Sequence, residues 1–400
     1  MYPNLYYAFS DLFGLELPFF KLVNSFGFFV AMAFLTAGFF LKKEIIRKTE
    51  QGAFSPTTSE ETIGNSATLG GIFGQSIIGF VFGWKFLFLA FNAGTLFEGG
   101  ALPQTFLFSL DGSILLGLLG ATSLGAWHWW ECKKTQLPEP VVQKREIQPH
   151  EHIGSLMTVA AVGGILGAKL FHFIEYPDQF ISFIQDPSLN AILGGLTIYG
   201  GLICGGLSVW LYARKLNLSF VHLADATAPS LMIAYGVGRI GCQVSGDGDW
   251  GIDNIASQPQ WMSWLPDWTW SYHFPNNVNR VGRLIRDSDP WDIFPGYGTC
   301  LDVPVFPTSL YETTMAIVIF SILWSIRKRI HIPGMLFGIY LIFNGFERFW
   351  IEKIRVNTTF DFIGIEMTQA ELISVMTMVS GVTLLTHLII RRNKQTASKI

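Results

Sequence analysis

The chain has 400 residues, of which 50% are hydrophobic, 15% aromatic and only 14% charged, with a formal net charge of −3. Water cannot solvate a surface of this composition, so a soluble globular protein is excluded and the chain is expected to lie in a bilayer. We therefore expect membrane lipids, and no nucleic acid, among its partners.

Nine apolar stretches predict an all-α polytopic membrane protein. A helix needs about 20 mostly apolar residues to cross the hydrocarbon core. In chain order the expected spans are residues 24–41, 70–91, 110–130, 153–175, 191–213, 222–244, 307–326, 333–352 and 371–390.

The segment before the first span, residues 1–20, contains no Lys or Arg. It therefore lacks the charged region of a secretory signal. Its aromatic residues are typical of a helix that lies in the membrane interface, so we expect it to be retained on the outer surface. These aromatics are Tyr2, Tyr6, Tyr7, Phe9 and Phe13.

The basic residues of the loops predict the orientation. If the spans alternate, seventeen of them fall on one side, beginning with Lys42 and ending with Lys399, and six fall on the other. The richer side is cytoplasmic by the positive-inside rule. The six are Lys21, Arg280, Arg283, Arg286, Lys353 and Arg355. The N-terminus is thus expected outside and the C-terminus in the cytoplasm.

The longest segment outside the membrane is expected at residues 245–306, an extracytoplasmic head that is rich in Trp. Its aromatic residues indicate either a belt resting on lipid headgroups or a ligand cage. The four cysteines are too few for a disulfide scaffold. Cys242 and Cys300 both fall toward the outer face, where a bridge between them is possible.

Four cations lie inside predicted spans, all near the outward end: Lys85, Lys169, Arg239 and Arg348. Charges at that depth are costly and usually functional. An anionic ligand such as a phospholipid phosphate would explain them, whereas snorkelling of the side chains to the interface is the alternative, above all for the lysines.

Arg239 is the clearest candidate for a ligand contact. Its guanidinium stays charged and offers two parallel N–H donors to phosphate oxygens. Small residues clear space beside it, and a turn rich in Gly and Asp follows. These neighbours are Gly236, Gly238, Gly241, Gly246, Asp247 and Asp249.

Three further segments carry candidate residues. Arg348, Glu352 and Arg355 have i, i+4, i+7 spacing, which predicts one helical face, either for a ligand or for an internal ion pair. Tyr311 and Glu312 begin another span, where Glu312 could also compensate an arginine. The third segment contains Gly194, Gly195, Tyr199, Gly200 and Gly201, where close helix packing is the alternative to a substrate contact.

Taken in order, these motifs resemble the prolipoprotein diacylglyceryl transferase family. They are Gly-Gly-Leu-x-x-x-Gly-Gly-Leu at 194–202, Asp225 to Pro229, Gly-Arg-Ile-Gly at 238–241 followed by Gly246 and Trp250-Gly251, Pro-Thr-x-Leu-Tyr-Glu at 307–312, and Arg348 to Arg355. The resemblance covers about residues 150–392 and the first helix. The pair of helices at about 70–130 looks like an insertion.

The resemblance implies that phosphatidylglycerol gives its diacylglyceryl group to the lipobox cysteine in the signal peptide of a prolipoprotein. A thioether forms and glycerol phosphate leaves, with no cofactor and no metal. It also implies the inner membrane of a bacterium, with the active site facing the outer leaflet. The chemistry of the residues is consistent with this reaction, because fixed cations stabilise the charge that develops on a leaving phosphate.

The sequence departs from the family in the residues that handle protons. Tyr199 stands where the family commonly has His, and a phenol is a poor base. Cys242 replaces an Asn, and Lys169 replaces an Arg and so loses the bidentate fork. We expect Arg239 and Arg348 to hold the phosphate, and Asp247, Asp249 or Glu352 to act as base or to orient the thiol.

Three units are expected: residues 1–48 with the first span, 49–152 with the inserted pair, and 153–400 as the catalytic core. Gly194, Gly195, Gly200, Gly201, Gly241, Gly246, Lys169, Tyr311, Glu312 and Arg355 are expected to bind substrate. The alternatives are a lipid-binding protein or transporter that uses the same cationic cavity, or a related transferase with a different acceptor.

Overall fold

The computed structural model is mostly helical, and it describes residues 1–96, 111–185, 195, 197–362 and 364–397. Every predicted span falls mainly on helix, although residues 110, 191–194 and 196 lie outside the described part. Within that part, five helical stretches are long and apolar enough to cross a membrane: Ser25–Glu50, Leu69–Asn92, Pro149–Glu175, Thr308–Ile326 and Gln369–Thr396. The protein is therefore a polytopic membrane protein, while nine crossings remain a prediction.

The α-helices in chain order are α1 (Leu5–Phe13), α2 (Ser25–Glu50), α3 (Leu69–Val81), α4 (Phe88–Leu96), α6 (Ile114–Thr135), α7 (Ile153–Glu175), α8 (Pro177–Gln185), α10 (Ile198–Lys215), α11 (Phe220–Ser245), α12 (Thr308–Ile326), α13 (Met335–Glu352) and α14 (Gln369–Ala397). A π-helical turn, Phe82–Leu87, joins α3 to α4. Four short 3-10 helices lie at Pro18–Leu22, Pro149–His152, Gln260–Met262 and Asp267–Thr269. The described residues also form three antiparallel strand pairs: β1 (Thr57–Ile63) with β2 (Val141–Ile147), β3 (Arg283–Leu284) with β4 (Thr299–Cys300), and β5 (Thr359–Phe362) with β6 (Ile365–Thr368).

Local sequence sets the ends of the helices that carry the site. The side chain of Asn24 caps α2 by accepting the backbone N–H of Phe26 at 2.8 Å. Helix α11 ends at Ser245 and is capped by Gly246, whose φ of +64° is a left-handed conformation that glycine adopts without strain. The chain therefore leaves the membrane helix sharply at this residue and enters the head.

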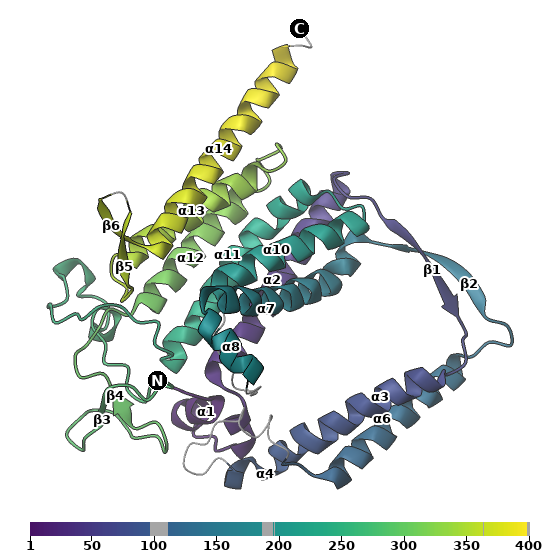
Figure 1. Ribbon diagram of the computed structural model, residues 1–400, viewed down its shortest axis with the longest axis horizontal. Coiled ribbons are helices and arrows are strands. Elements are labelled where there is room, and N and C mark those ends of the chain that lie inside the picture. The colour runs from purple at the N-terminus through teal and green to yellow at the C-terminus, as the bar shows by residue number, and fades with distance from the viewer. Residues whose placement is uncertain (97–110, 186–194, 196, 363, 398–400) are drawn as a thin grey trace.

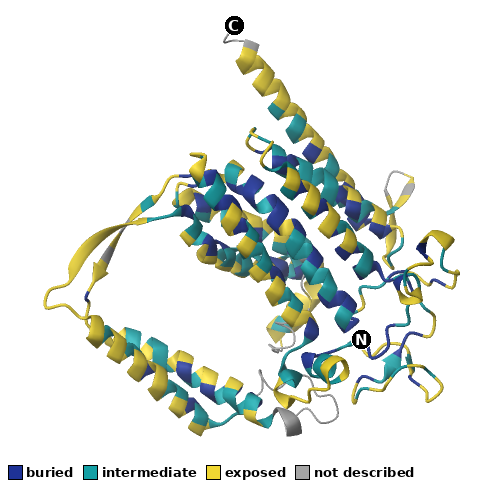
Figure 2. Cartoon of the chain, turned by 180° about the vertical axis from the view of Figure 1, so that it is seen from behind, coloured by how far each residue is buried: buried dark blue, intermediate teal, exposed yellow. Residues whose placement is uncertain are grey.

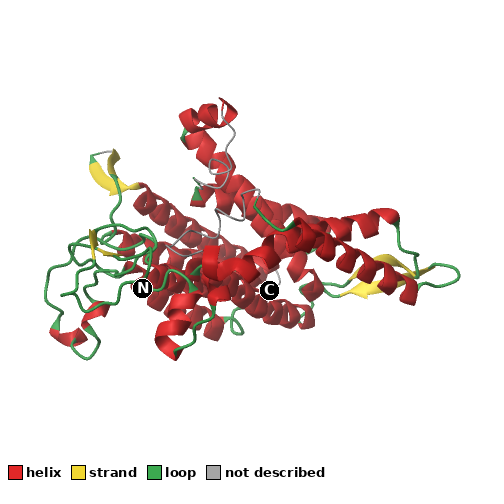
Figure 3. Ribbon diagram, turned by 90° about the horizontal axis from the view of Figure 1, so that it is seen from below, coloured by secondary structure: helices red, strands yellow, loops and turns green. Residues whose placement is uncertain are grey.

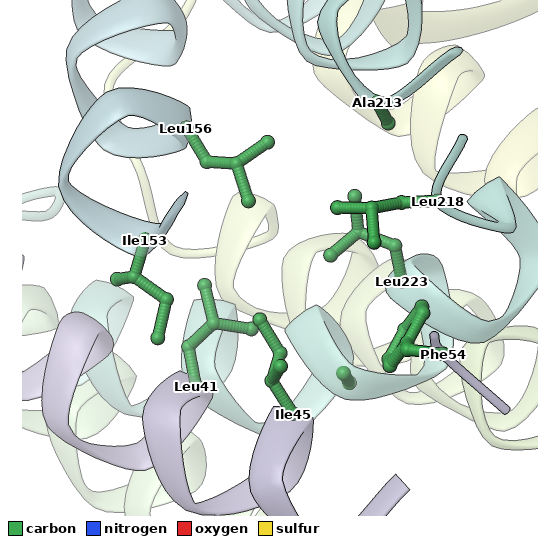
Figure 4. Packing of buried hydrophobic residues seen from close by; sticks show 9 residues of the cluster. Leu41, Ile45, Phe54, Ile153, Leu156, Ala213, Leu218 and Leu223 are labelled. Atoms are coloured by element: carbon green, nitrogen blue, oxygen red, sulfur yellow. The ribbon is translucent and has the colours of Figure 1, made fainter. Parts of the chain in front are cut away.

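Among the described residues, the helix bundle contains two large apolar cores. One joins the ends of α2, α7, α10 and α11 on the side predicted to be cytoplasmic (Figure 4). The other joins α11, α12 and α13 around residues such as Met232, Ala316 and Leu323. Buried positions concentrate where these helices meet, and the outward faces stay exposed (Figure 2), as expected for helices that lipid surrounds.

Helices α3 and α6 form a hairpin that stands away from the bundle (Figure 1). A Cβ on Gly79 would overlap the backbone of Gly120, so the two glycines allow close packing. The ribbon of β1 and β2 connects this hairpin to the bundle, with Glu60 opposite Lys144.

The head is built mainly of loops, and Figure 3 shows these loops gathered near the N-terminus. Its small core contains Phe274, Leu301 and Val305. From the N-terminal segment, the ring of Tyr7 stacks on Phe294 with centroids 4.4 Å apart. Helix α1 thus lies on the side of the head, where the sequence predicted it. Cys242 and Cys300 are both free thiols, so the possible bridge is not formed.

At the other end of the bundle is a buried group of charged residues, which we call the inner ion cluster: Glu44, Arg47, Lys48, Asp225 and Arg327. The Glu44 carboxylate lies 2.7 Å from both arginines, and the Asp225 carboxylate lies 3.4 Å from the Lys48 ammonium. Asp225 does not cap its own helix. Instead, it accepts the backbone N–H groups of Gly334 and Phe337, at 2.9 and 3.0 Å, at the start of α13.

Candidate active site

Six charged residues meet at the ends of α11, α12 and α13 that are predicted to face outward, and we call them the outer ion cluster: Arg239, Asp249, Glu312, Arg348, Glu352 and Arg355. Glu312 is fully buried at its centre. Its carboxylate lies 3.0 Å from Arg239 Nε and 3.3 Å from Nη1 of both Arg348 and Arg355. One carboxylate therefore fixes three guanidinium groups, one from α11 and two from the end of α13 and the turn after it.

Asp249 is the second bridge between the arginines. It accepts hydrogen bonds from Arg239 and, at 2.5 Å, from Arg355. Its backbone carbonyl accepts the hydroxyls of Thr308 and Ser309, at 2.7 and 3.1 Å, from the start of α12. Burial of Asp249 disfavours its ionised form, but the two arginines outweigh burial and lower its pKa to about 2.

The structure corrects the predicted helical face. Helix α13 ends at Glu352, so Arg355 lies in the following turn and pairs as an isolated bridge with Gly251. The helix cannot continue through that bridge, yet Arg355 still reaches the cluster. Glu352 lies 3.0 Å from Arg348 within the helix, as its i, i+4 spacing predicted.

Asp247 and Cys242 lie at the edge of the cluster. The Cys242 sulfur and the carboxylate oxygens of Asp247 and Asp249 are within 4.8 Å of one another. Burial, and then the negative charge of Asp249, raise the pKa of Asp247 above its ordinary value. The two neighbouring aspartates therefore shift in opposite directions, and Asp247 is the one better suited to accept a proton near neutral pH.

The predicted glycines take part in packing and turns. A Cβ on Gly241 would lie 2.9 Å from the Cβ of Phe29 on α2, and one on Gly201 would lie 3.3 Å from the Gly164 carbonyl of α7. Gly246 is the left-handed cap of α11. Close contacts therefore account for these positions, and a substrate contact remains a prediction.

Two more glycines border α7. A Cβ on Gly200 would approach the Gly167 carbonyl, and one on Gly195 would overlap the ring of His172. Gly194 lies outside the described residues. Tyr199, between these positions, is close enough to Arg348 and Glu352 for both charges to act on its hydroxyl.

Three other candidates have contacts of their own. The Tyr311 hydroxyl donates to the Thr269 carbonyl at 2.8 Å, which ties α12 to the head. The Lys169 ammonium lies 4.5 Å from the centre of the Phe173 ring. The Lys85 ammonium donates to the Asp111 carbonyl within the hairpin. For Lys169, a contact with phosphate remains a prediction.

The structure adds two residues that sequence reasoning missed. The Tyr235 ring lies 5.3 Å from the guanidinium carbon of Arg239, and the Tyr235 hydroxyl donates to Glu347 at 3.3 Å. An acidic residue directly before Arg348 in an apolar helix was the available signal for Glu347.

The arrangement of charges in the outer ion cluster favours binding of an anion. Arg239, Arg348 and Arg355 converge on a small region, and the side chain of Arg348, 26% exposed, is the most open of the three. Cys242, Asp247 and Asp249 could contribute ligand atoms to a metal ion. However, Asp249 is already paired with two arginines, whose charges would oppose a bound cation.

The profile of the prolipoprotein diacylglyceryl transferase family matches residues 113–387. The match begins just before α6, the second helix of the pair predicted to be inserted, and it leaves out α2. The division of the chain into three units therefore stays a prediction.

Several similar proteins carry the name phosphatidylglycerol–prolipoprotein diacylglyceryl transferase. The one from Bifidobacterium adolescentis is 28% identical over 261 residues, which cover 64% of this chain and 67% of the relative. Those from Frankia alni and Corynebacterium efficiens are also 28% identical, over 54% and 58% of this chain and 49% and 65% of their own lengths. The chain thus spans about half to two thirds of these relatives. Because the family profile covers more than half of it, this chain belongs to the prolipoprotein diacylglyceryl transferase family.

Proposed function

We propose that the protein transfers the diacylglyceryl group of phosphatidylglycerol to the lipobox cysteine thiol of prolipoproteins. The observation that carries this proposal is the outer ion cluster, where one arginine from α11 and two from the end of α13 and its following turn converge beside three carboxylates. The names of its relatives support both substrates. We further propose nine membrane crossings, an external N-terminus, a cytoplasmic C-terminus and an inner-membrane location with the site facing the outer leaflet.

In this proposal, Arg239, Arg348 and Arg355 bind the lipid phosphate. The thiol sulfur attacks the glycerol carbon that bears the phosphate, the C–O bond breaks, and its electron pair leaves with the phosphate oxygen. The guanidinium groups stabilise the charge that develops there, and a preorganised donor of this kind is worth about 10²–10³-fold in rate.

The phosphate must compete with a carboxylate for the arginines. Asp249 accepts hydrogen bonds from both Arg239 and Arg355, so an incoming phosphate has to replace Asp249 or share these donors with it. Arg348 offers the more open approach. We therefore expect the lipid to engage Arg348 first and Arg239 afterwards.

Asp247 is the proposed general base. Of the three carboxylates considered from the sequence, Asp249 is held ionised by two arginines and Glu352 is paired with Arg348. Asp247 has a raised pKa and lies beside a thiol, that of Cys242. It can take the proton from the acceptor thiol, while Tyr199 orients the phosphate or the thiol.

The test is transfer of labelled diacylglycerol from phosphatidylglycerol to a lipobox peptide by the purified protein in detergent. A peptide with Ser in place of Cys is the control, and glycerol phosphate is measured as the co-product. Thiol-dependent transfer with equal release of glycerol phosphate is expected. Lipid binding without any transfer would instead favour a binding protein, an alternative motivated by Tyr199 in place of the family's His.

A further inference from the structure

Glu347 differs from the other carboxylates at the outer ends of these helices. It is 1% exposed, and one of its oxygens accepts the Tyr235 hydroxyl at 3.3 Å. Its other oxygen has no hydrogen-bond partner. Among the described residues, no cation lies within ion-pair distance of Glu347.

Two neighbours provide a direct comparison. One oxygen each of Glu312 and Glu352 also lacks an aligned hydrogen bond. Those two oxygens, however, lie 3.0 Å from arginine nitrogens. Glu347 has no such compensation, because Arg239 and Arg348 direct their nitrogens to other carboxylates.

A buried carboxylate without a cation or further donors is very costly to keep ionised, and the usual solution is to take up a proton. The groups that face Glu347 do not change this conclusion. They are Tyr235 and Arg239 from α11, Glu312 from α12, and Tyr340 and Arg348 from α13. The two arginines are already engaged, and the charge of Glu312 disfavours a second anion nearby.

Glu347 reaches the cluster through Tyr235. The hydroxyl of Tyr235 donates to Glu347, and its ring lies 5.3 Å from the guanidinium carbon of Arg239. The pair therefore supports Arg239 from the side facing the membrane interior. A ring held in place under a guanidinium keeps that cation oriented.

The charges of the outer ion cluster balance without Glu347. Three arginines are paired with Asp249, Glu312 and Glu352, so one more negative charge would repel an incoming phosphate. We propose that Glu347 is a protonated, uncharged positioning residue that holds Tyr235 beneath Arg239 and keeps the cluster receptive to the phosphate group of a lipid. This inference rests on the proposed function, because phosphate is the ligand that the neutral carboxyl favours.

The first test compares two substitutions in the full-length protein in detergent. Glu347→Ala removes the support of Tyr235, and we expect kcat/KM for phosphatidylglycerol to fall about tenfold, mainly through KM. Glu347→Gln retains the shape and the hydrogen bonds of a neutral carboxyl and should restore most of that loss. Glu312→Gln is the matched control. It removes the charge of a carboxylate that is paired with arginines, so it should not preserve kcat/KM as Glu347→Gln does.

The second test is the pH dependence. Raising the pH ionises Glu347, adds a negative charge beside Arg239 and should raise KM for the lipid in the wild type. Glu347→Gln cannot ionise and should lack this rise. A purely structural role for Glu347 would not produce this difference.

An infrared measurement separates this inference from the proposed reaction. The wild-type protein should show the carbonyl stretch of a protonated carboxyl that is absent in Glu347→Gln. If this band is present and binding of phosphatidylglycerol vesicles follows the same pH pattern while no transfer occurs, the proposed reaction fails and this inference stands. Two results would contradict the inference. Either Glu347→Gln is as impaired as Glu347→Ala, or the carbonyl band is the same in the wild type and in Glu347→Gln.

Discussion

The inner and outer ion clusters lie at opposite ends of the same group of helices, and they differ in how completely their charges are satisfied. In the inner cluster, Asp225 pairs with Lys48 and accepts two backbone N–H groups. In and beside the outer cluster, Glu312, Glu347 and Glu352 each have an oxygen without a hydrogen bond. Among the described residues, no member of the inner cluster has such an oxygen.

The difference separates structural from functional charge. A buried ion network with every group satisfied joins helices and specifies their positions. A buried network with an adjoining carboxylate, that of Glu347, which has an oxygen without a hydrogen bond and no cation beside it, is poorly suited to stability alone. Such a network is reasonable where a ligand must enter and exchange partners with the arginines. Substitutions in the outer cluster should therefore reduce activity more than stability, and substitutions in the inner cluster should do the reverse.

The largest effect is expected for Arg239→Ala. Transfer should fall about 10³-fold because the leaving phosphate loses one of its two more buried cations, whereas thermal stability in detergent should change little, since Glu312 and Asp249 keep other arginine partners. Activity per folded protein and the melting temperature are the measurements. Arg280→Ala, in the head, is the control. Near-full activity of Arg239→Ala would contradict a phosphate site at this position.

Asp247→Asn should reduce transfer about 10²-fold, as expected when a general base is removed. The sign of the pH dependence follows from its raised pKa. Asp247 must be ionised to accept the thiol proton, so the wild-type rate should fall as pH drops through that pKa, and the variant should lack this acid limb. Asp249 stays ionised over the same range, because its pKa is about 2. A variant that kept the full acid limb would assign the base to another residue.

For the inner cluster the expectation reverses. Asp225→Asn weakens the pairing with Lys48 and one cap of α13, which should cost about 2 kcal/mol of stability for hydrogen bonds to a charged group. The melting temperature should fall, while transfer per folded molecule should stay close to that of the wild type. A specific loss of activity at unchanged stability would remove the distinction between the two clusters.

Sequence patterns predicted much of this comparison. Apolar stretches located the helices, and the depth of Arg239 and Arg348 indicated the end of the bundle where the outer ion cluster lies, because charge in a membrane span is informative on its own. Side-chain partners were harder to predict. Asp225, on α11, caps α13, and Arg355 was expected on one helical face with Arg348 but follows α13. Both depend on contacts between segments more than 100 residues apart, which local periodicity does not encode.

The smallest effect is expected for Tyr199→Phe. If Tyr199 only orients the phosphate or the thiol, removing its hydroxyl should cost about tenfold or less, the usual worth of one hydrogen bond. A His at position 199 need not act here as it does in the family, since this chain also departs from the family pattern at Cys242 and Lys169. A Tyr199→His variant therefore provides the sharper test. Increased transfer with a new acid limb would indicate that the site still accommodates the family's base, whereas no gain would indicate that Asp247 has taken over its task.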